Sequence, residues 1–169
     1  IAVTFSEAVY NATGGSGALE ATDFTLGISG GTATLSSTTP SSISISGNVY
    51  TLGLSLSGTP DGGETVTVVP SSATAIYDGS DNAASTTQSN NTVGLNDQAV
   101  PTITGTTVAT DNSTIAVTFS EAVYNATGGS GALEATDFAL GISGGTATLS
   151  STTPSSISIS GNVYTLGLS

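Results

Sequence analysis

The sequence contains one stretch twice: Ile1-Ala-Val-Thr-Phe-Ser-Glu-Ala-Val-Tyr10 returns as Ile115-Ala-Val-Thr-Phe-Ser-Glu-Ala-Val-Tyr124. The match extends over residues 1–55 and 115–169, which differ only in Thr25 against Ala139. A repeat at a constant offset of 114 residues indicates a tandem array of copies, each large enough for one small domain. The 169 residues therefore correspond to about one and a half units, and we expect them to belong to a longer array.

Apolar and polar residues alternate with a period of two through most of the repeat, which predicts β-strands that are buried on one face. The apolar positions that share a phase include Ile1, Val3, Phe5, Phe24, Leu26, Ile28, Tyr50, Leu52, Leu54, Val66 and Val68. Phe5, Phe24 and Tyr50 are therefore expected in the core, whereas Tyr10 and Tyr77 border loops. Only residues 17–23 suggest a helical turn, which is too short to form a helix alone.

Turn signals separate these strands. Thr59-Pro-Asp-Gly-Gly63 and Asp78-Gly-Ser-Asp-Asn82 carry the residues that tight turns require. Seven or so short strands per 114 residues predict an all-β, immunoglobulin-like β-sandwich. We place the domains at 1–96, which lacks its first strand, and 97–169, which supplies that strand but lacks its last two.

Four motifs in this order resemble the bacterial Ig-like domains that are strung together in large surface and secreted proteins. They are Val3-Thr-Phe-Ser-Glu-Ala-Val9, Thr22-Asp-Phe-Thr-Leu26, Ala75-Ile-Tyr-Asp-Gly-Ser-Asp-Asn-Ala83 and Asn96-Asp-Gln-Ala-Val-Pro-Thr102. The sequence departs from the pattern at Asp81, where a glycine is expected before Asn82. The resemblance covers the whole repeat and implies an extracellular adhesin, stalk or filament, and it does not imply an enzyme.

The charge is all of one sign: 12 acidic residues and no Lys, Arg or His. Nucleic-acid binding and anchoring to an anionic membrane both need cationic side chains, so both are excluded. A His-based triad and a Lys Schiff base are excluded for the same reason, and the absence of Cys excludes disulfides. No run reaches the ~18 apolar residues of a membrane span. We expect a soluble chain exposed to an extracellular environment, on the cell surface or secreted.

Calcium is the cofactor that this composition favours, because hard cations bind carboxylate, amide and carbonyl oxygens. If strands alternate in direction, the turn with Asp61 and Glu64 lies beside the linker with Asn96 and Asp97. Glu121, just after the second strand of the next copy, then points back toward that linker. The predicted interdomain ligands are therefore Asp61, Glu64, Asn96, Asp97 and Glu121, and a second set at the opposite end comprises Asp78, Asp81 and Glu7.

The alternative for these carboxylates is a purely structural role in turns, with Asx side chains bonded to their own backbone. Asp78-Gly-Ser-Asp-Asn82 does not fit the EF-hand loop, and a glycosidase-like carboxylate pair has no apolar pocket to support it. The sequence leaves the calcium and turn interpretations open, and it points to no catalytic residue.

The function favoured by these features is structural: a stalk repeat of an extracellular adhesin or surface filament. Its partners would be neighbouring copies of itself, in tandem or joined by strand exchange, because a sandwich that lacks a strand exposes a groove and unpaired edges. The alternative is a binding module that recognises a glycan or a surface protein through the loops around residues 6–23.

Overall fold

The computed structural model describes all 169 residues, and it confirms the all-β prediction. Every strand pair is antiparallel. The helical content is limited to two 3-10 turns, η1 (Ala21–Asp23) and η2 (Ala135–Asp137). η1 lies where the sequence suggested one helical turn. The chain has no helix of the length and hydropathy that a membrane span needs.

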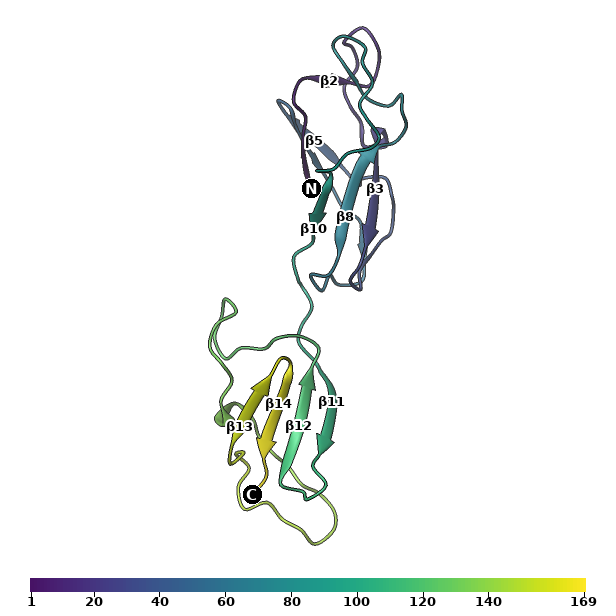
Figure 1. Cartoon of the computed structure of the whole chain (residues 1–169). Coiled ribbons are helices and arrows are strands. Elements are labelled where there is room, and N and C mark those ends of the chain that lie inside the picture. Colours follow the sequence, from purple (N-terminus) through teal and green to yellow (C-terminus); the bar gives the residue numbers. More distant parts are fainter. The chain divides into compact units, whose positions relative to one another are not determined.

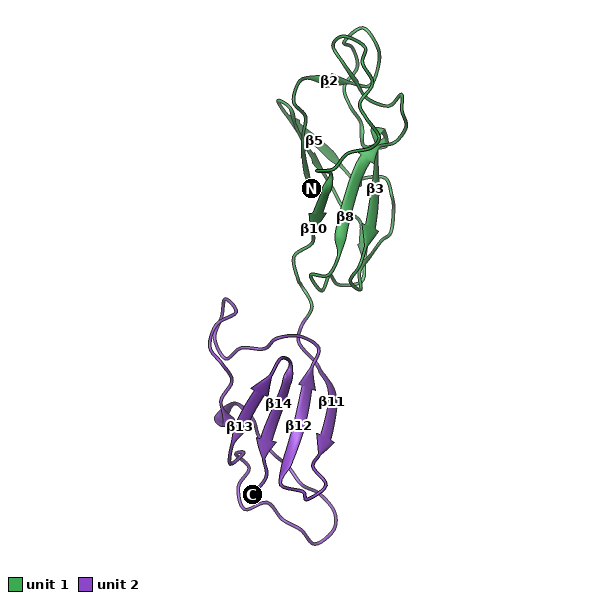
Figure 2. Cartoon of the chain, viewed as in Figure 1, with its two compact units in different colours: residues 1–99 green, residues 100–169 purple.

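The chain forms two compact units, Ile1–Ala99 and Val100–Ser169 (Figure 2). The division lies three residues beyond the boundary that the sequence predicted between residues 96 and 97. Each unit is built around its own antiparallel sheet, so each is described by itself.

Unit 1 contains two three-stranded sheets and two short ribbons (Figure 1). The first sheet has the order β1 (Ala2–Thr4), β6 (Val49–Leu52), β5 (Ile43–Ser46). The second has the order β10 (Thr92–Gly94), β8 (Thr65–Pro70), β3 (Phe24–Ser29). The ribbons pair β2 (Val9–Tyr10) with β9 (Tyr77–Asp78), and β4 (Thr34–Leu35) with β7 (Leu56–Ser57). This arrangement is consistent with a β-sandwich.

The unit has ten short strands rather than about seven, because some predicted strands are divided. The alternating run from Tyr50 to Leu56 ends as β6 at Leu52 and resumes as β7. Between them, Gly53 exchanges backbone hydrogen bonds with Ser41 and Ser42 instead of extending either strand.

The core of unit 1 lies where the alternation placed it. Phe24, Leu26, Tyr50 and Leu52 are all buried. The ring of Phe5 meets that of Tyr50 edge to face at 5.4 Å between centroids, and Phe24 lies 6.3 Å from Tyr50. Such offset aromatic contacts add to the free energy gained from burial of apolar area. The core assignment of these three aromatic residues is therefore confirmed.

Unit 2 contains one four-stranded sheet, whose strands lie side by side in Figure 1. Its order is β11 (Ile103–Val108), β12 (Thr114–Phe119), β14 (Val163–Gly167), β13 (Ile157–Ser160). A turn at Asp111 and Asn112 joins the first two strands, and Asn112 adopts a positive φ of 57°.

Three of these strands repeat the first sheet of unit 1. Val117 pairs with Tyr164 as Val3 pairs with Tyr50, and the ring of Phe119 meets that of Tyr164 at 5.4 Å. The fourth strand, β11, has no counterpart in unit 1, where β1 is an edge strand. The same sequence thus builds the same three-stranded sheet twice, once with a covering strand and once without.

The repeat also contains a segment that folds in only one copy. Residues 24–29 form β3 and pair with β8, whereas residues 138–143 form no strand. Unit 2 contains no counterpart of β8, and Ile142 is 52% exposed. Since the local sequences differ only in Thr25 against Ala139, the partner strand decides whether this segment becomes β-structure.

Hydrogen exchange provides a matched test of this difference. The amide of Leu26 bonds to the carbonyl of Thr38, so the alternating amides of Gly27 and Ser29 face β8. We predict that Gly27 and Ser29 exchange at least about tenfold more slowly than Gly141 and Ser143, which have the same neighbours. Amide exchange measured by NMR would show this. Equal rates at the matched positions would contradict the role assigned to β8.

Candidate functional site

The one charged side chain in the buried interior is that of Glu64, which is 1% exposed. Its Oε1 accepts hydrogen bonds from the backbone amides of Thr32 at 2.9 Å and Ala33 at 2.8 Å. The amide of Asp61 lies 3.2 Å from Oε2. In a chain without Lys, Arg or His, a buried carboxylate can be satisfied only by neutral donors, and here backbone N–H groups fill that role.

Two glycines shape the loop that encloses this carboxylate. Gly30 and Gly31 have φ values of 75° and 57°, a region that side chains other than glycine rarely adopt. A Cβ on Gly31 would lie 2.2 Å from Cδ of Glu64. The loop therefore needs glycine for both its conformation and its close approach. Alternation alone indicates an inward position for Glu64, because it shares phase with Val66 and Val68.

These contacts set the ionisation of Glu64. The hydrogen bond from the Ala33 amide lowers the pKa of the Glu64 carboxyl, and those from Asp61, Glu64 itself and Thr32 act in the same direction. Desolvation opposes them but does not reverse the shift. Glu64 is thus held as an anion that links the 30–33 loop to the turn before β8.

Other predicted ligands lie close to the turn before β8, at the end of unit 1 that leads into the linker. The amides of Gln98 and Ala99 both donate to the Pro60 carbonyl, at 2.8 and 3.0 Å. Asp97 Oδ1 accepts from the Ala99 amide at 2.8 Å, and Asp61 Oδ1 accepts from the Gly63 amide at 3.0 Å. The carboxylates of Asp61, Glu64 and Asp97 each accept backbone hydrogen bonds, and Asn96 is exposed beside Asp97.

The chain contains no group of three or more Asp or Glu side chains that could hold a metal ion. Glu121 lies in unit 2, just after β12, and so belongs to a different unit from the other four predicted interdomain ligands. The structure brings Asp61, Glu64, Asn96 and Asp97 to one end of unit 1. Calcium binding by this set stays a prediction.

The second predicted set lies around the β2–β9 ribbon. Asp78 Oδ1 accepts from the amides of Ser80 at 2.8 Å and Asn82 at 2.9 Å, and Oδ2 accepts from Asn82 Nδ2. The Asn82 side chain and then its amide lower the pKa of the Asp78 carboxyl, with Ser80 adding to the shift against desolvation. This is an Asx turn, the alternative to a metal site that the sequence left open. Glu7 is exposed after β1.

Asp81 occupies the position before Asn82 at which the bacterial Ig-like pattern expects glycine. Its φ is 68°, so it adopts the left-handed conformation for which the pattern expects glycine. Its carboxylate accepts a hydrogen bond from the Gly14 amide, which ties this turn to the loop after β2. No local pattern in the sequence predicts that long-range contact.

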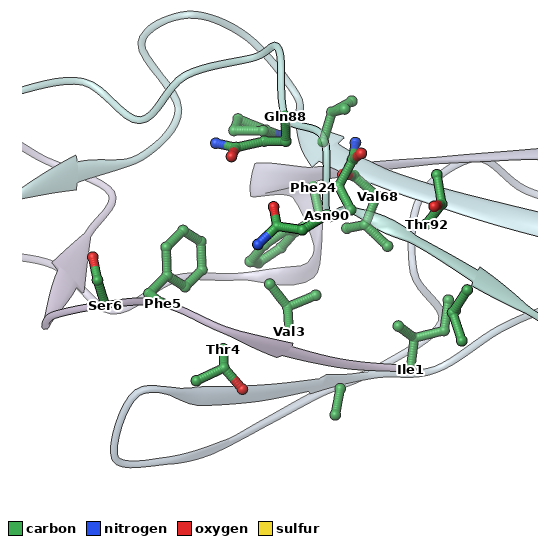
Figure 3. Close-up of a pocket in the computed structure, with 15 residues that line it drawn as sticks. Ile1, Val3, Thr4, Phe5, Ser6, Phe24, Val68, Gln88, Asn90 and Thr92 are labelled. Carbon is green, nitrogen blue, oxygen red and sulfur yellow. The ribbon is translucent and has the colours of Figure 1, made fainter.

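A groove of about 510 Å³ runs beside β1 in unit 1 (Figure 3). Figure 3 shows Val3 and Phe5 pointing to one side of the β1 backbone, toward Phe24, while Thr4 points to the other. The far wall comes from β8 and β10, and residues 88–91 close the rim. The groove is apolar at its base and polar at its rim, and one of its edges is the unpaired edge of β1.

Comparisons of the chain with protein-family models, with curated proteins and with solved structures give no match. The resemblance to bacterial Ig-like domains therefore rests on the four sequence motifs.

The two copies allow a controlled test of the loop around Glu64. Gly31→Ala and Gly145→Ala each place a side chain at positive φ, with values of 57° and 68°, which costs about 1–2 kcal/mol. Nothing lies within 4 Å of a Cβ at Gly145, whereas at Gly31 the Glu64 carboxylate must move. We predict a larger drop in unfolding free energy for Gly31→Ala, measured by urea unfolding. Equal losses would show that the carboxylate contact does not stabilise the fold.

The lowered pKa of Glu64 has a defined pH signature. Because the folded-state pKa lies below the ordinary value of 4.5, the ionised carboxylate stabilises the fold fully above that value. This contribution is lost as the pH falls from 4.5 through the folded-state pKa. We predict that the wild-type protein has a higher free energy of unfolding than Glu64→Gln at neutral pH. This difference in free energy should become smaller in acid. A gap in urea-unfolding free energy that is independent of pH would contradict an ionised Glu64.

Proposed function

We propose that this chain is a stalk segment of an extracellular adhesin or surface filament, built from tandem immunoglobulin-like β-sandwich units. One observation carries the proposal: residues 1–55 and 115–169 differ at a single position and form the same three-stranded sheet with the same aromatic contacts. A unit copied with so little change adds length and repeats its surface. Neighbouring copies would be its main partners.

The charge of the chain supports an extracellular, non-catalytic role. All 12 ionisable acidic side chains lack a cationic partner in the sequence, so the units repel one another and resist collapse into a compact array. The one buried carboxylate, Glu64, is bonded to three backbone amides and so is not free to transfer protons. The four family-like motifs support the same surface or secreted location.

Single-molecule extension tests the mechanical role directly. Pulling the full chain between its termini should give a discrete unfolding event for unit 1, because its strands pair across long sequence separations. The event should release about 330–350 Å of chain for 99 residues. Smooth extension without a force peak would contradict a load-bearing stalk.

Glycan binding by the same protein sample tests the alternative function, a binding module. The loops around residues 6–23 include Tyr10, which is half-buried, and a Cβ on Gly15 would lie 3.8 Å from its ring. Specific binding of the chain to a glycan array, abolished by Tyr10→Ala, would favour glycan recognition through these loops over a pure stalk.

We also propose that calcium stiffens the linker end of unit 1, as the acidic composition favours. Extracellular modules bind calcium with dissociation constants of roughly 10⁻⁴–10⁻³ M. Millimolar calcium should therefore produce binding heat and raise the melting temperature of unit 1, while Asp61→Asn combined with Asp97→Asn should abolish both effects. Magnesium serves as the control ion. No heat and no stabilisation by calcium would remove the metal from this proposal.

A further inference from the structure

The first sheet of unit 1 ends at β5, whose outer edge has no strand partner. In unit 2 the corresponding strand, β13, likewise ends the four-stranded sheet, and Figure 1 shows it at one side of that sheet. The two units contain different flanking parts of the repeat, since residues 56–99 follow the shared segment in unit 1 and residues 100–114 precede it in unit 2. Neither part pairs with β5 or β13. The free edge is therefore a property of the whole repeat.

The backbone groups of Ile43 and Ile45 form this edge. The amide of Gly53 donates to the Ser42 carbonyl at 3.0 Å, so Ser42 faces β6, and the equivalent bond in unit 2 is 2.9 Å long. Backbone groups of successive residues point to opposite sides of a strand, so those of Ser44 also face β6. Those of Ile43 and Ile45 point outward. N–H and C=O groups without a strand partner can pair with a further strand.

The fold covers the outer edge of another strand but leaves that of β5 open. β3 ends the second sheet of unit 1, and the amide of Leu26 on its outer side donates to the Thr38 carbonyl at 2.7 Å. β5 has no such bond, and it carries neither a charged residue nor a proline, the residues that commonly protect a free edge.

An apolar side chain beside this edge is only partly covered. Ile45 is 47% exposed, and its equivalent, Ile159, is 45% exposed. Each lies opposite a buried tyrosine, Tyr50 or Tyr164, and so on the inner face of its sheet. The two exposed fractions agree although the units contain different flanking parts of the repeat. A further strand beside β5 would extend the inner face and cover this isoleucine.

The charge distribution indicates which partner fits this edge. Residues 24–60 contain no Asp or Glu, and neither do residues 138–169, although the chain has 12 acidic residues. A cationic partner would therefore be attracted to the segments that carry the carboxylates, and not to β5. Two copies of this chain can approach each other here with little repulsion. The edge thus fits an uncharged strand, and β5 is itself such a strand.

We propose that β5 is a site of edge-to-edge pairing with β5 or β13 of a second copy of this chain. The segment Ser42-Ile-Ser-Ile-Ser46 reads the same in both directions, so an antiparallel pair of two such strands is self-complementary. The inference goes beyond the proposed stalk, because it assigns a contact between separate chains and its structural basis does not depend on that function.

The register that uses both outward-facing residues is centred on Ser44. Ile43 then lies opposite Ile45 of the second copy, and Ser44 lies opposite its own equivalent. Each isoleucine pair exchanges both backbone hydrogen bonds, because the N–H and C=O groups of these residues point outward. Residues opposite each other share a face, so the isoleucines of the two copies pack together on the inner face. Burial of their side chains adds to the backbone pairing.

Each chain carries this edge twice, in β5 and in β13. One chain can therefore bind two others, so association extends beyond a dimer. Once one edge has paired, the second edge of the same chain meets a partner at a raised effective concentration wherever the geometry allows both contacts.

Sedimentation equilibrium of the full chain, from micromolar to millimolar concentration, should show reversible self-association. Ser44→Asp combined with Ser158→Asp places like charges opposite each other across the contact and should weaken association at least about tenfold. The matched control is Thr51→Asp combined with Thr165→Asp, which adds the same charge to the same outer face one strand farther from the edge. The control should change association by less than about threefold, because solvent and salt screen the more distant charges. A wild-type chain that stays monomeric, or equal weakening by the two variants, would overturn the proposal.

Amide exchange measured by NMR gives a second result that needs no variant. The amides of Ile43 and Ile45 should exchange at least about tenfold more slowly in the associated chain than in dilute solution, because they become hydrogen-bonded. The amide of Ser44 already faces β6 and serves as the internal control, with a smaller change. Unchanged exchange at Ile43 and Ile45 under conditions in which the chain associates would show that another surface forms the contact, and would overturn the proposal.

The register can be tested by disulfide cross-linking, since the chain has no cysteine of its own. Ser44→Cys places two thiols directly opposite each other, at a separation that a disulfide can bridge, and should give covalent dimers under mild oxidation. Ser46→Cys should not, because Ser46 lies opposite Ser42 of the second copy. Equal yields of dimer from the two variants would overturn the stated register.

These outcomes are distinguishable from those that test the stalk. Absence of self-association removes the edge contact and leaves a single-chain stalk intact. A featureless force–extension curve removes the stalk and leaves the edge contact.

Discussion

Backbone pairing between strands that are far apart in the sequence is the constraint on which this structure depends. The repeated 55 residues show it directly, because they meet different partners in the two units. Where β8 is present, residues 24–29 form a strand and Ile28 is half-buried. Where it has no counterpart, residues 138–143 remain irregular. The local sequence is compatible with a strand, but the strand forms only where a distant strand offers unpaired N–H and C=O groups for pairing.

The same constraint explains how a chain with no cationic side chain keeps a buried carboxylate. Glu64 faces inward ahead of β8, where it lacks any ion-pair partner, and the 30–33 loop turns its amides toward it. That loop can approach only because Gly31 has no Cβ. A charge-assisted backbone cradle thus replaces the salt bridge that other acidic proteins could use. Its donors come from the loop after β3 and from the turn before β8.

Much of this fold could be predicted from the sequence. The period-two alternation identified the all-β class and the aromatic core of Phe5, Phe24 and Tyr50. The Pro, Gly and Asx residues identified the turns at 59–63 and 78–82. These features depend on residues that lie close together in the chain, so local patterns report them.

The remainder depends on non-local geometry. The pairing of β2 with β9 and the contact of Asp81 with the Gly14 amide join segments more than sixty residues apart. For the candidate ligands, the alternating direction of the strands was enough to predict that the 59–64 turn lies close to residues 97–99. The amide contacts around Glu64 and the contact of Asp81 with the Gly14 amide could not be predicted, because they join distant loops and involve positive φ values at Gly30, Gly31 and Asp81. The wall that β8 and β10 build opposite β1 could not be predicted either, because those strands are far from β1 in the sequence.

The central claim is that one repeat of 114 residues is a self-contained unit in which every strand has its partner. Its most direct test is thermal unfolding of a chain in which residues 100–169 are followed by residues 56–99. That order supplies β11 to the edge strand and β8 to residues 138–143 at once. The account predicts one cooperative transition, more than about 10 °C above that of either unit in the 169-residue chain, since the side chains of Ile103 and Val108 become buried. A transition no higher than those of the two units would contradict it.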